Sequence, residues 1–217
     1  MLPLGDDNSD RRTFPLLTYA LIALNVLFFL VEMSGGDAFG MQWAFVPSRF
    51  MATPFADAPT LFSSMFMHAG WLHLGGNMLY LWIFGDNVED RFGHVTYLIF
   101  YLLCGLSATA AQLFFSLGSS VPNLGASGAI AGVLGAYLLM FPQRRVRVLL
   151  YSRIAEVPAL IVIGLWFVLQ LFSSIGSISG AAQSGGGVAY MAHVGGFVAG
   201  LLLGILFRGG RGAVERD

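Results

Sequence analysis

The sequence has little charge, no lysine and a single cysteine. Only 11% of its 217 residues are charged, against roughly 25% in an ordinary soluble domain, and this excludes most soluble folds. All 11 residues of the lysine and arginine class are arginine, and the formal net charge is -1. No basic surface is therefore available for nucleic acid. The lone Cys104 excludes an internal disulfide and a cysteine-based zinc site.

Apolar residues and glycine are abundant instead. Hydrophobic residues make up 56% of the chain, and the mean hydropathy is +0.73. This is more apolar surface than one soluble core can hide, so the chain is expected to be solvated by lipid. The 28 glycines are nearly double the usual share of about 7%. Close packing of helices within a membrane explains such a glycine content.

Apolar stretches long enough to cross a bilayer as helices recur along the chain. They predict an all-α, polytopic membrane protein with six transmembrane helices, near residues 16–33, 66–84, 94–116, 126–141, 157–175 and 187–207. The fourth stretch is short and follows the Gly/Ser/Pro-containing segment 117–125, so we expect it to begin below the membrane surface. The predicted organisation is an N-terminal tail (1–15), a six-helix membrane domain (16–207) and a C-terminal tail (208–217).

Arginine placement predicts the orientation, because basic residues in short loops stay on the cytoplasmic side. Ten of the 11 arginines fall in the two tails or in the 2–3 and 4–5 connections, which puts both termini in the cytoplasm. The short tails and the lack of an organelle-targeting extension favour a bacterial plasma membrane. Arg49 lies in the external segment 34–65, whose many aromatic residues suggest short helices in the outer leaflet or a loop that packs over the bundle.

Polar side chains inside the spans are few, and several fall at one depth. His73 and Asn77 share a helix face in the outer half of the second span. Ser127 opens the fourth span, and His193 lies about six residues into the sixth. All three spans run inward, so these four groups are expected to meet in the outer half of the membrane. The isolated residues Asn25, Gln112 and Gln170 are interpreted as hydrogen-bonding between helices, with no chemistry assigned.

Glycine spacing predicts that the fourth and sixth spans touch. Small residues recur at intervals of four in both, as in Gly128 and Gly132 of one and Gly196 and Gly200 of the other. Such spacing lets helix backbones approach closely. Ser127 and His193 would then face each other across this contact.

These residue types suit acyl transfer. Histidine can take the proton of a serine hydroxyl that attacks a carbonyl, and the resulting oxyanion needs fixed N–H donors. Ser127 and His193 fit the first pair of roles, while His73, Asn77 and the Ser127 backbone N–H fit the donors. No acidic side chain within the membrane is expected to orient His193, so we expect a Ser/His dyad without a third carboxylate.

Taken in chain order, the motifs resemble those of the rhomboid family of intramembrane serine proteases. The matching motifs are His73-x-x-x-Asn77, Gly125-Ala126-Ser127-Gly128 and Ala192-His193-x-x-Gly196. The resemblance implies that Ser127 is the nucleophile, His193 the general base and His73 and Asn77 the oxyanion stabilisers. It implies supporting roles for His68, Gly125 and Gly128 and a structural role for Glu89 and Arg91.

The resemblance also implies a substrate and a route to the site. The expected substrate is a transmembrane protein, cleaved near the outer face and entering between the second and fifth spans. No cofactor, metal or nucleic acid is expected, and membrane lipid is the other partner.

Two positions depart from the family pattern. Family members frequently carry an aromatic residue four positions after the serine, where its ring can support the base, and here that residue is Ala131. The first loop has no adjacent Trp-Arg pair, only Trp43 and Arg49.

Three other functions compete with the protease. An inactive relative that binds membrane proteins without cleaving them would not need all four reactive groups. A transporter would place polar residues in both leaflets. A metal site built from His68, His73 and His193 would lack a carboxylate within the membrane and the H-E-x-x-H pattern.

Overall fold

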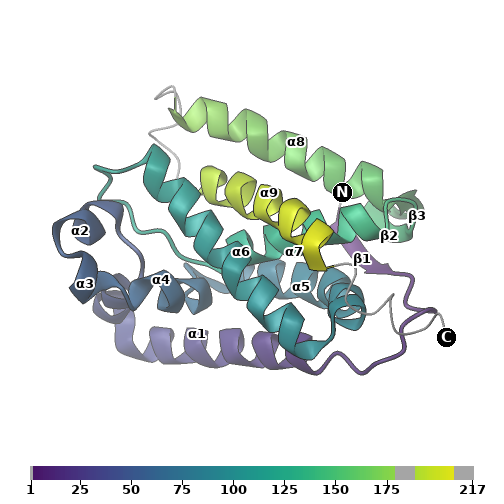
Figure 1. Cartoon of the computed structure of the whole chain (residues 1–217), viewed down its shortest axis with the longest axis horizontal. Helices are drawn as coiled ribbons and strands as arrows, with labels where there is room; N and C mark the ends of the chain where they lie inside the picture. The colour runs from purple at the N-terminus through teal and green to yellow at the C-terminus, as the bar shows by residue number, and fades with distance from the viewer. Residues whose placement is uncertain (1, 179–188, 208–217) are drawn as a thin grey trace.

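The computed structural model describes residues 2–178 and 189–207, and the protein is mostly helical (Figure 1). Its long helices are α1 (Leu16–Trp43), α5 (Trp71–Phe92), α6 (His94–Phe115), α7 (Ser127–Met140), α8 (Ala159–Ile178) and α9 (Tyr190–Phe207). Of these, α1, α6 and α9 are long and apolar enough to cross a membrane, and α7 and residues 159–173 of α8 are shorter apolar helices. The predicted C-terminal tail (208–217) and the first two residues of the predicted sixth span, 187 and 188, lie outside the described residues.

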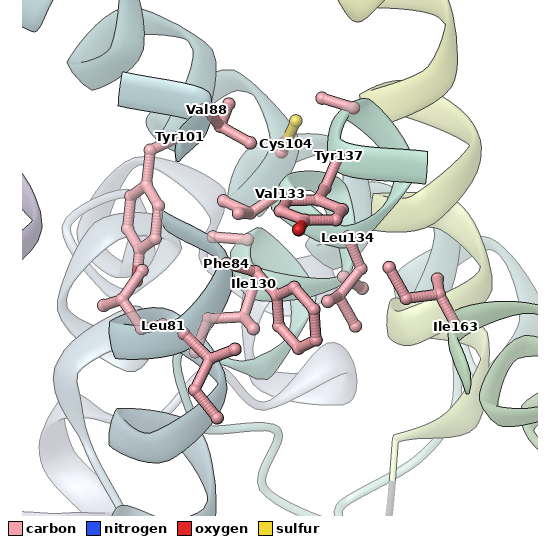
Figure 2. Packing of buried hydrophobic residues seen from close by; sticks show 14 of the residues in the cluster. Leu81, Phe84, Val88, Tyr101, Cys104, Ile130, Val133, Leu134, Tyr137 and Ile163 are labelled. Carbon is pink, nitrogen blue, oxygen red and sulfur yellow. The ribbon is translucent and has the colours of Figure 1, made fainter. Parts of the chain in front are cut away.

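Helix α7 forms the centre of the core. Every residue from Gly128 to Tyr137 is buried. Figure 2 shows Ile130, Leu134 and Tyr137 of α7 packed among apolar side chains from α5, α6 and α8. A helix enclosed on all sides needs no polar face, which explains why its sequence is apolar throughout. Its 14 residues agree with the predicted short fourth span.

The contact between α7 and α9 is one of backbone against backbone. A Cβ added at Gly200 would lie 2.0 Å from the carbonyl oxygen of Gly132, and one at Gly196 would lie 2.0 Å from that of Gly128. Both distances are far below van der Waals contact, so only glycine fits at these positions. The predicted contact between the fourth and sixth spans is confirmed.

Helices α1 and α8 lie on opposite edges of the bundle (Figure 1). They expose large apolar side chains such as Leu24 and Leu27 on α1 and Leu165 and Leu169 on α8. Such a surface suits a hydrocarbon environment and would be unfavourable in water.

The connection between α1 and α5 contains short helices, which is one of the two alternatives that the sequence left open. They are α2 (Pro47–Ala52), α3 (Pro54–Asp57), α4 (Thr60–Ser63) and the 3-10 turn η1 (Ser64–Phe66). Arg49 holds this connection together: its guanidinium donates to Asp57 Oδ2 at 2.7 Å and to the carbonyl oxygens of Met41 and Ala44 at 2.7 and 2.6 Å. It therefore fixes the end of α1 against the short helices that follow.

The expectation of an all-α fold is wrong in one respect, because a three-stranded antiparallel sheet lies at the end of the bundle opposite the short helices (Figure 1). Its strands are β1 (Leu2–Asp6), β2 (Arg145–Leu150) and β3 (Arg153–Pro158), in the order β1-β2-β3. In β2, Arg145 is exposed whereas Val146 and Val148 are buried. This alternation is the signature of a strand with one buried face.

Helix α5 differs from its predicted span, 66–84, at both ends. It begins at Trp71, and it ends later than predicted because its polar end from Asp86 to Arg91 is also helical. The buried Glu89 carboxylate accepts hydrogen bonds from the backbone N–H groups of Leu17 and Thr18, at 2.8 and 2.7 Å, and from the Thr18 hydroxyl at 2.7 Å. Helix α1 has no capping side chain of its own. Glu89 therefore caps α1 from a neighbouring helix, in keeping with its expected structural role.

Candidate active site

Ser127 is the first residue of α7 and therefore lies at the N-terminus of the central helix. The turn that delivers it contains Gly125, whose φ of 123° is unfavourable for other residues and whose N–H donates to the Ser64 carbonyl oxygen at 2.8 Å. Gly128, one residue on, leaves no room for a side chain, because an added Cβ would lie 2.5 Å from Ala108 Cβ. Both glycines thus fix the backbone around Ser127.

His193 of α9 faces this serine across the glycine contact. Its Nε2 lies 2.7 Å from Ser127 Oγ. Its Nδ1 lies 2.7 Å from Oε1 of Gln170, on α8. Because Oε1 can only accept, Nδ1 carries the hydrogen and Nε2 presents a lone pair to the serine hydroxyl. This is the arrangement in which an imidazole can remove the serine proton.

His73 and Asn77 of α5 lie beside the turn that precedes Ser127. A Cβ added at Gly125 would lie 2.8 Å from His73 Nε2 and 3.6 Å from Asn77 Nδ2. The Asn77 amide is buried, and Nδ2 has no hydrogen-bond partner among the described residues. His73 Nδ1 accepts from the Ala69 N–H at 3.4 Å, so its Nε2 is the protonated nitrogen. Two N–H donors therefore lie beside the turn that carries the serine.

His68 contacts His73, and the structure gives it no contact with Ser127 or His193. The two histidine rings meet edge to face, with centroids 5.1 Å apart. The backbone N–H of His68 donates to Glu32 Oε2 at 2.9 Å, and its Nδ1 lies 3.2 Å from the Phe66 carbonyl oxygen. It is thus placed to support the His73 ring and to line the neighbouring cavity of about 640 Å³.

The space next to Ser127 is small. A cavity of about 20 Å³ borders Ser127, Gly125 and Ala192, enough for about one water molecule. This cavity alone is too small for a peptide. Within the described residues, no three His, Cys, Asp or Glu side chains lie close enough together to hold a metal ion.

Two contacts of His193 were not foreseen from the sequence. Gln170 does bond between helices, as predicted, but its partner is His193. Trp166, also on α8, packs its ring against the His193 ring with centroids 5.9 Å apart. Gln112 bonds between helices as well, accepting from the Ala192 N–H at 3.2 Å. The spacing of Trp166 and Gln170, four residues apart on one helix face, was the signal available in the sequence.

Known proteins resemble the chain over most of its length. The family model described as the Rhomboid domain matches residues 56–210. The chain is 30% identical over 193 residues to Rhomboid protein 1, mitochondrial, of Saccharomyces cerevisiae, which covers 87% of this chain and 52% of that protein. It is 32% identical over 199 residues to Rhomboid protease GluP of Bacillus subtilis, covering 88% of this chain and 35% of that protein. The chain thus spans about half or less of the length of these relatives.

Proposed function

Because the chain belongs to the rhomboid family, we propose that it is an intramembrane serine endopeptidase that cleaves transmembrane segments of other membrane proteins near the outer face. The observation that carries the proposal is the 2.7 Å contact between Ser127 Oγ and His193 Nε2. The unpartnered Asn77 donor beside the same turn supports it.

The first chemical step is attack on the scissile carbonyl carbon. Ser127 Oγ forms the new bond while its proton passes to His193 Nε2. Negative charge develops on the former carbonyl oxygen, where the donors of His73, Asn77 and the Ser127 backbone N–H stabilise it. The positive end of the α7 dipole adds to this stabilisation.

Collapse of the tetrahedral intermediate breaks the peptide bond. His193 returns its proton to the leaving amine, and the acyl group stays on Ser127. A water molecule, for which the cavity beside Ser127 has room, then repeats the attack with His193 as base. The second intermediate releases the carboxylic acid and restores the serine hydroxyl.

We also propose how the protein lies in the membrane, from its apolar helices and the distribution of its arginines. Helices α1, α5, α6, α7, α8 and α9 are the six spans of a membrane domain over residues 16–207. Both termini face the cytoplasm, and the sheet lies on that side. Substrate enters between α5 and α8 when the connection that contains α2 to α4 moves.

The test is cleavage of a single-span substrate, with a small residue near its outer membrane boundary, by purified protein in liposomes. We expect no cleavage from Ser127→Ala or His193→Ala and a fall in kcat of about 100-fold from Asn77→Ala, the usual effect of losing one oxyanion donor. A chelator should have no effect. Ser34→Ala is the matched control, because among the described residues the Ser34 hydroxyl donates to the Leu30 carbonyl oxygen of its own helix and has no other partner.

Two results would contradict the proposal, provided that thermal unfolding shows each variant to be folded. Cleavage by Ser127→Ala at the wild-type rate would exclude the nucleophile. A wild-type protein that binds but does not cleave a set of such substrates would instead be an inactive relative that binds membrane proteins.

A further inference from the structure

His193 receives its lateral support from α8. Ala131, on α7, offers only a buried methyl group, at the position where the family pattern frequently has an aromatic ring beside the base. Trp166 and Gln170 contact His193 from another helix instead: the Trp166 ring packs against the imidazole, and Gln170 Oε1 lies 2.7 Å from Nδ1. Since they are four residues apart, one face of α8 delivers both contacts.

The half of α8 that carries these contacts is only partly buried. From Gly164 to Ser173 none of its residues is fully buried, and Leu165, Leu169 and Phe172 are exposed. Besides the two contacts with His193, this half stacks Phe167 on Phe197 of α9, with ring centroids 4.2 Å apart. A polar side chain on such a helix is costly in lipid unless it has a partner. The bond to His193 supplies that partner.

We propose that Gln170 is a positioning residue for His193: by accepting the hydrogen of Nδ1, it keeps the lone pair on Nε2 directed at Ser127. Without this acceptor the imidazole is free to move its hydrogen to Nε2, which would then donate to Ser127 Oγ and take no proton from it. This role rests on the proposed protease function. A neutral amide adds no charge, so its effect is smaller than that of a carboxylate in a triad.

The decisive variant is Gln170→Met, which keeps the length and apolar fit of the side chain but is at best a weak acceptor. We expect kcat for the single-span substrate to fall about tenfold, the equivalent of one lost hydrogen bond, with KM unchanged. Gln170→Glu, which retains an acceptor of the same length, should restore kcat. Leu169→Ala is the matched control: it alters the lipid-facing side of the same turn and should behave as wild type.

A measurement without substrate separates positioning from folding. In ¹⁵N-histidine-labelled protein in nanodiscs, the His193 signals, assigned by comparison with His193→Ala, should report hydrogen on Nδ1 in the wild type and in Gln170→Glu. In Gln170→Met, a substantial share of the protein molecules should carry the imidazole hydrogen of His193 on Nε2. Because this readout needs only folded protein, it decides the role of Gln170 even if the wild type proves inactive, an outcome that would contradict the protease proposal alone.

Two results would overturn the proposal. One is a Gln170→Met protein with the wild-type kcat and an unchanged position of the imidazole hydrogen. The other is an equal loss of activity in Gln170→Met and Gln170→Glu with that position unchanged, which would make Gln170 a packing residue only.

Discussion

Replacing Gly200 by alanine tests whether the α7–α9 contact sets the geometry of the dyad. The added Cβ would lie 2.0 Å from the Gly132 carbonyl oxygen, about 1.4 Å inside the 3.4 Å at which ordinary contact begins. The three atoms nearest to this Cβ all belong to the Gly132 backbone, so no side chain can move to make room for it. Either the helices separate by roughly that amount at this level, or one of them bends.

The separation of the two helices should also displace His193 from Ser127, because Gly200 lies about two helical turns from His193 on the same helix. A displacement of about 1 Å is enough to reduce kcat about 100-fold, and overpacking of this kind lowers the free energy of unfolding by about 1 to 3 kcal/mol. The assays are the cleavage of the single-span substrate and the thermal unfolding of the purified protein.

Gly164→Ala on α8 is the matched control, because a Cβ added there meets nothing within 4 Å. It should leave kcat unchanged, with stability equal or raised by up to about 1 kcal/mol, since alanine is the better helix former. Wild-type activity and stability in Gly200→Ala would refute the view that backbone contact fixes the position of His193.

Two further predictions concern the sheet and the substrate route. Burial raises the pKa of Asp6, in β1, from 3.8 to about 7, although the Tyr137 hydroxyl opposes this shift. The folded protein therefore holds a proton that the unfolded chain releases between about pH 4 and 7, and the free energy of unfolding should fall over that range by at most about 4 kcal/mol. Asp6→Asn should remove this slope in denaturation measured from pH 4 to 8, and an unchanged slope would assign it to other groups. For the route, a disulfide engineered between α5 and α8 should stop cleavage until it is reduced, and full activity of the oxidised protein would exclude entry there.

The helical part of the fold could be predicted because lipid imposes a simple length rule on apolar segments. The rule failed at the polar end of α5. Asp86 and Glu89 lie in the helix there because they bond to the segment around Arg11 and to the first turn of α1. Hydropathy alone does not show that a charged side chain caps a distant helix.

The sheet was missed although its pattern was present. Arg145 to Val148 alternate in character, but they were interpreted as a short connection between spans. One of their partners, Arg153–Pro158, follows directly as the second strand of a hairpin. The other, Leu2–Asp6, lies more than 130 residues away in the sequence, and that pairing becomes visible only in three dimensions.

Within the site, the sequence predicted that Ser127 and His193 would face each other, and the structure has them 2.7 Å apart. Their catalytic roles, like those of His73 and Asn77, stay predictions. Gln170 was assigned no chemistry because a single glutamine in an apolar helix is typically a bond between helices. Which residue it meets depends on the rotation of α8 about its own axis, and the sequence does not encode that in any local pattern.

The glycine contact between α7 and α9 also bears on how the proposed activity could be controlled. At Gly196 and Gly200 of α9 the nearest atoms are backbone atoms of Gly128 and Gly132 of α7, so no side chain at these two points can change rotamer to let the helices shift. Ser127 and His193 lie at the end of this close contact, one on each helix. We therefore expect any control of the proposed cleavage to act through elements outside the α7–α9 contact, such as α8, which contacts His193 through Trp166 and Gln170.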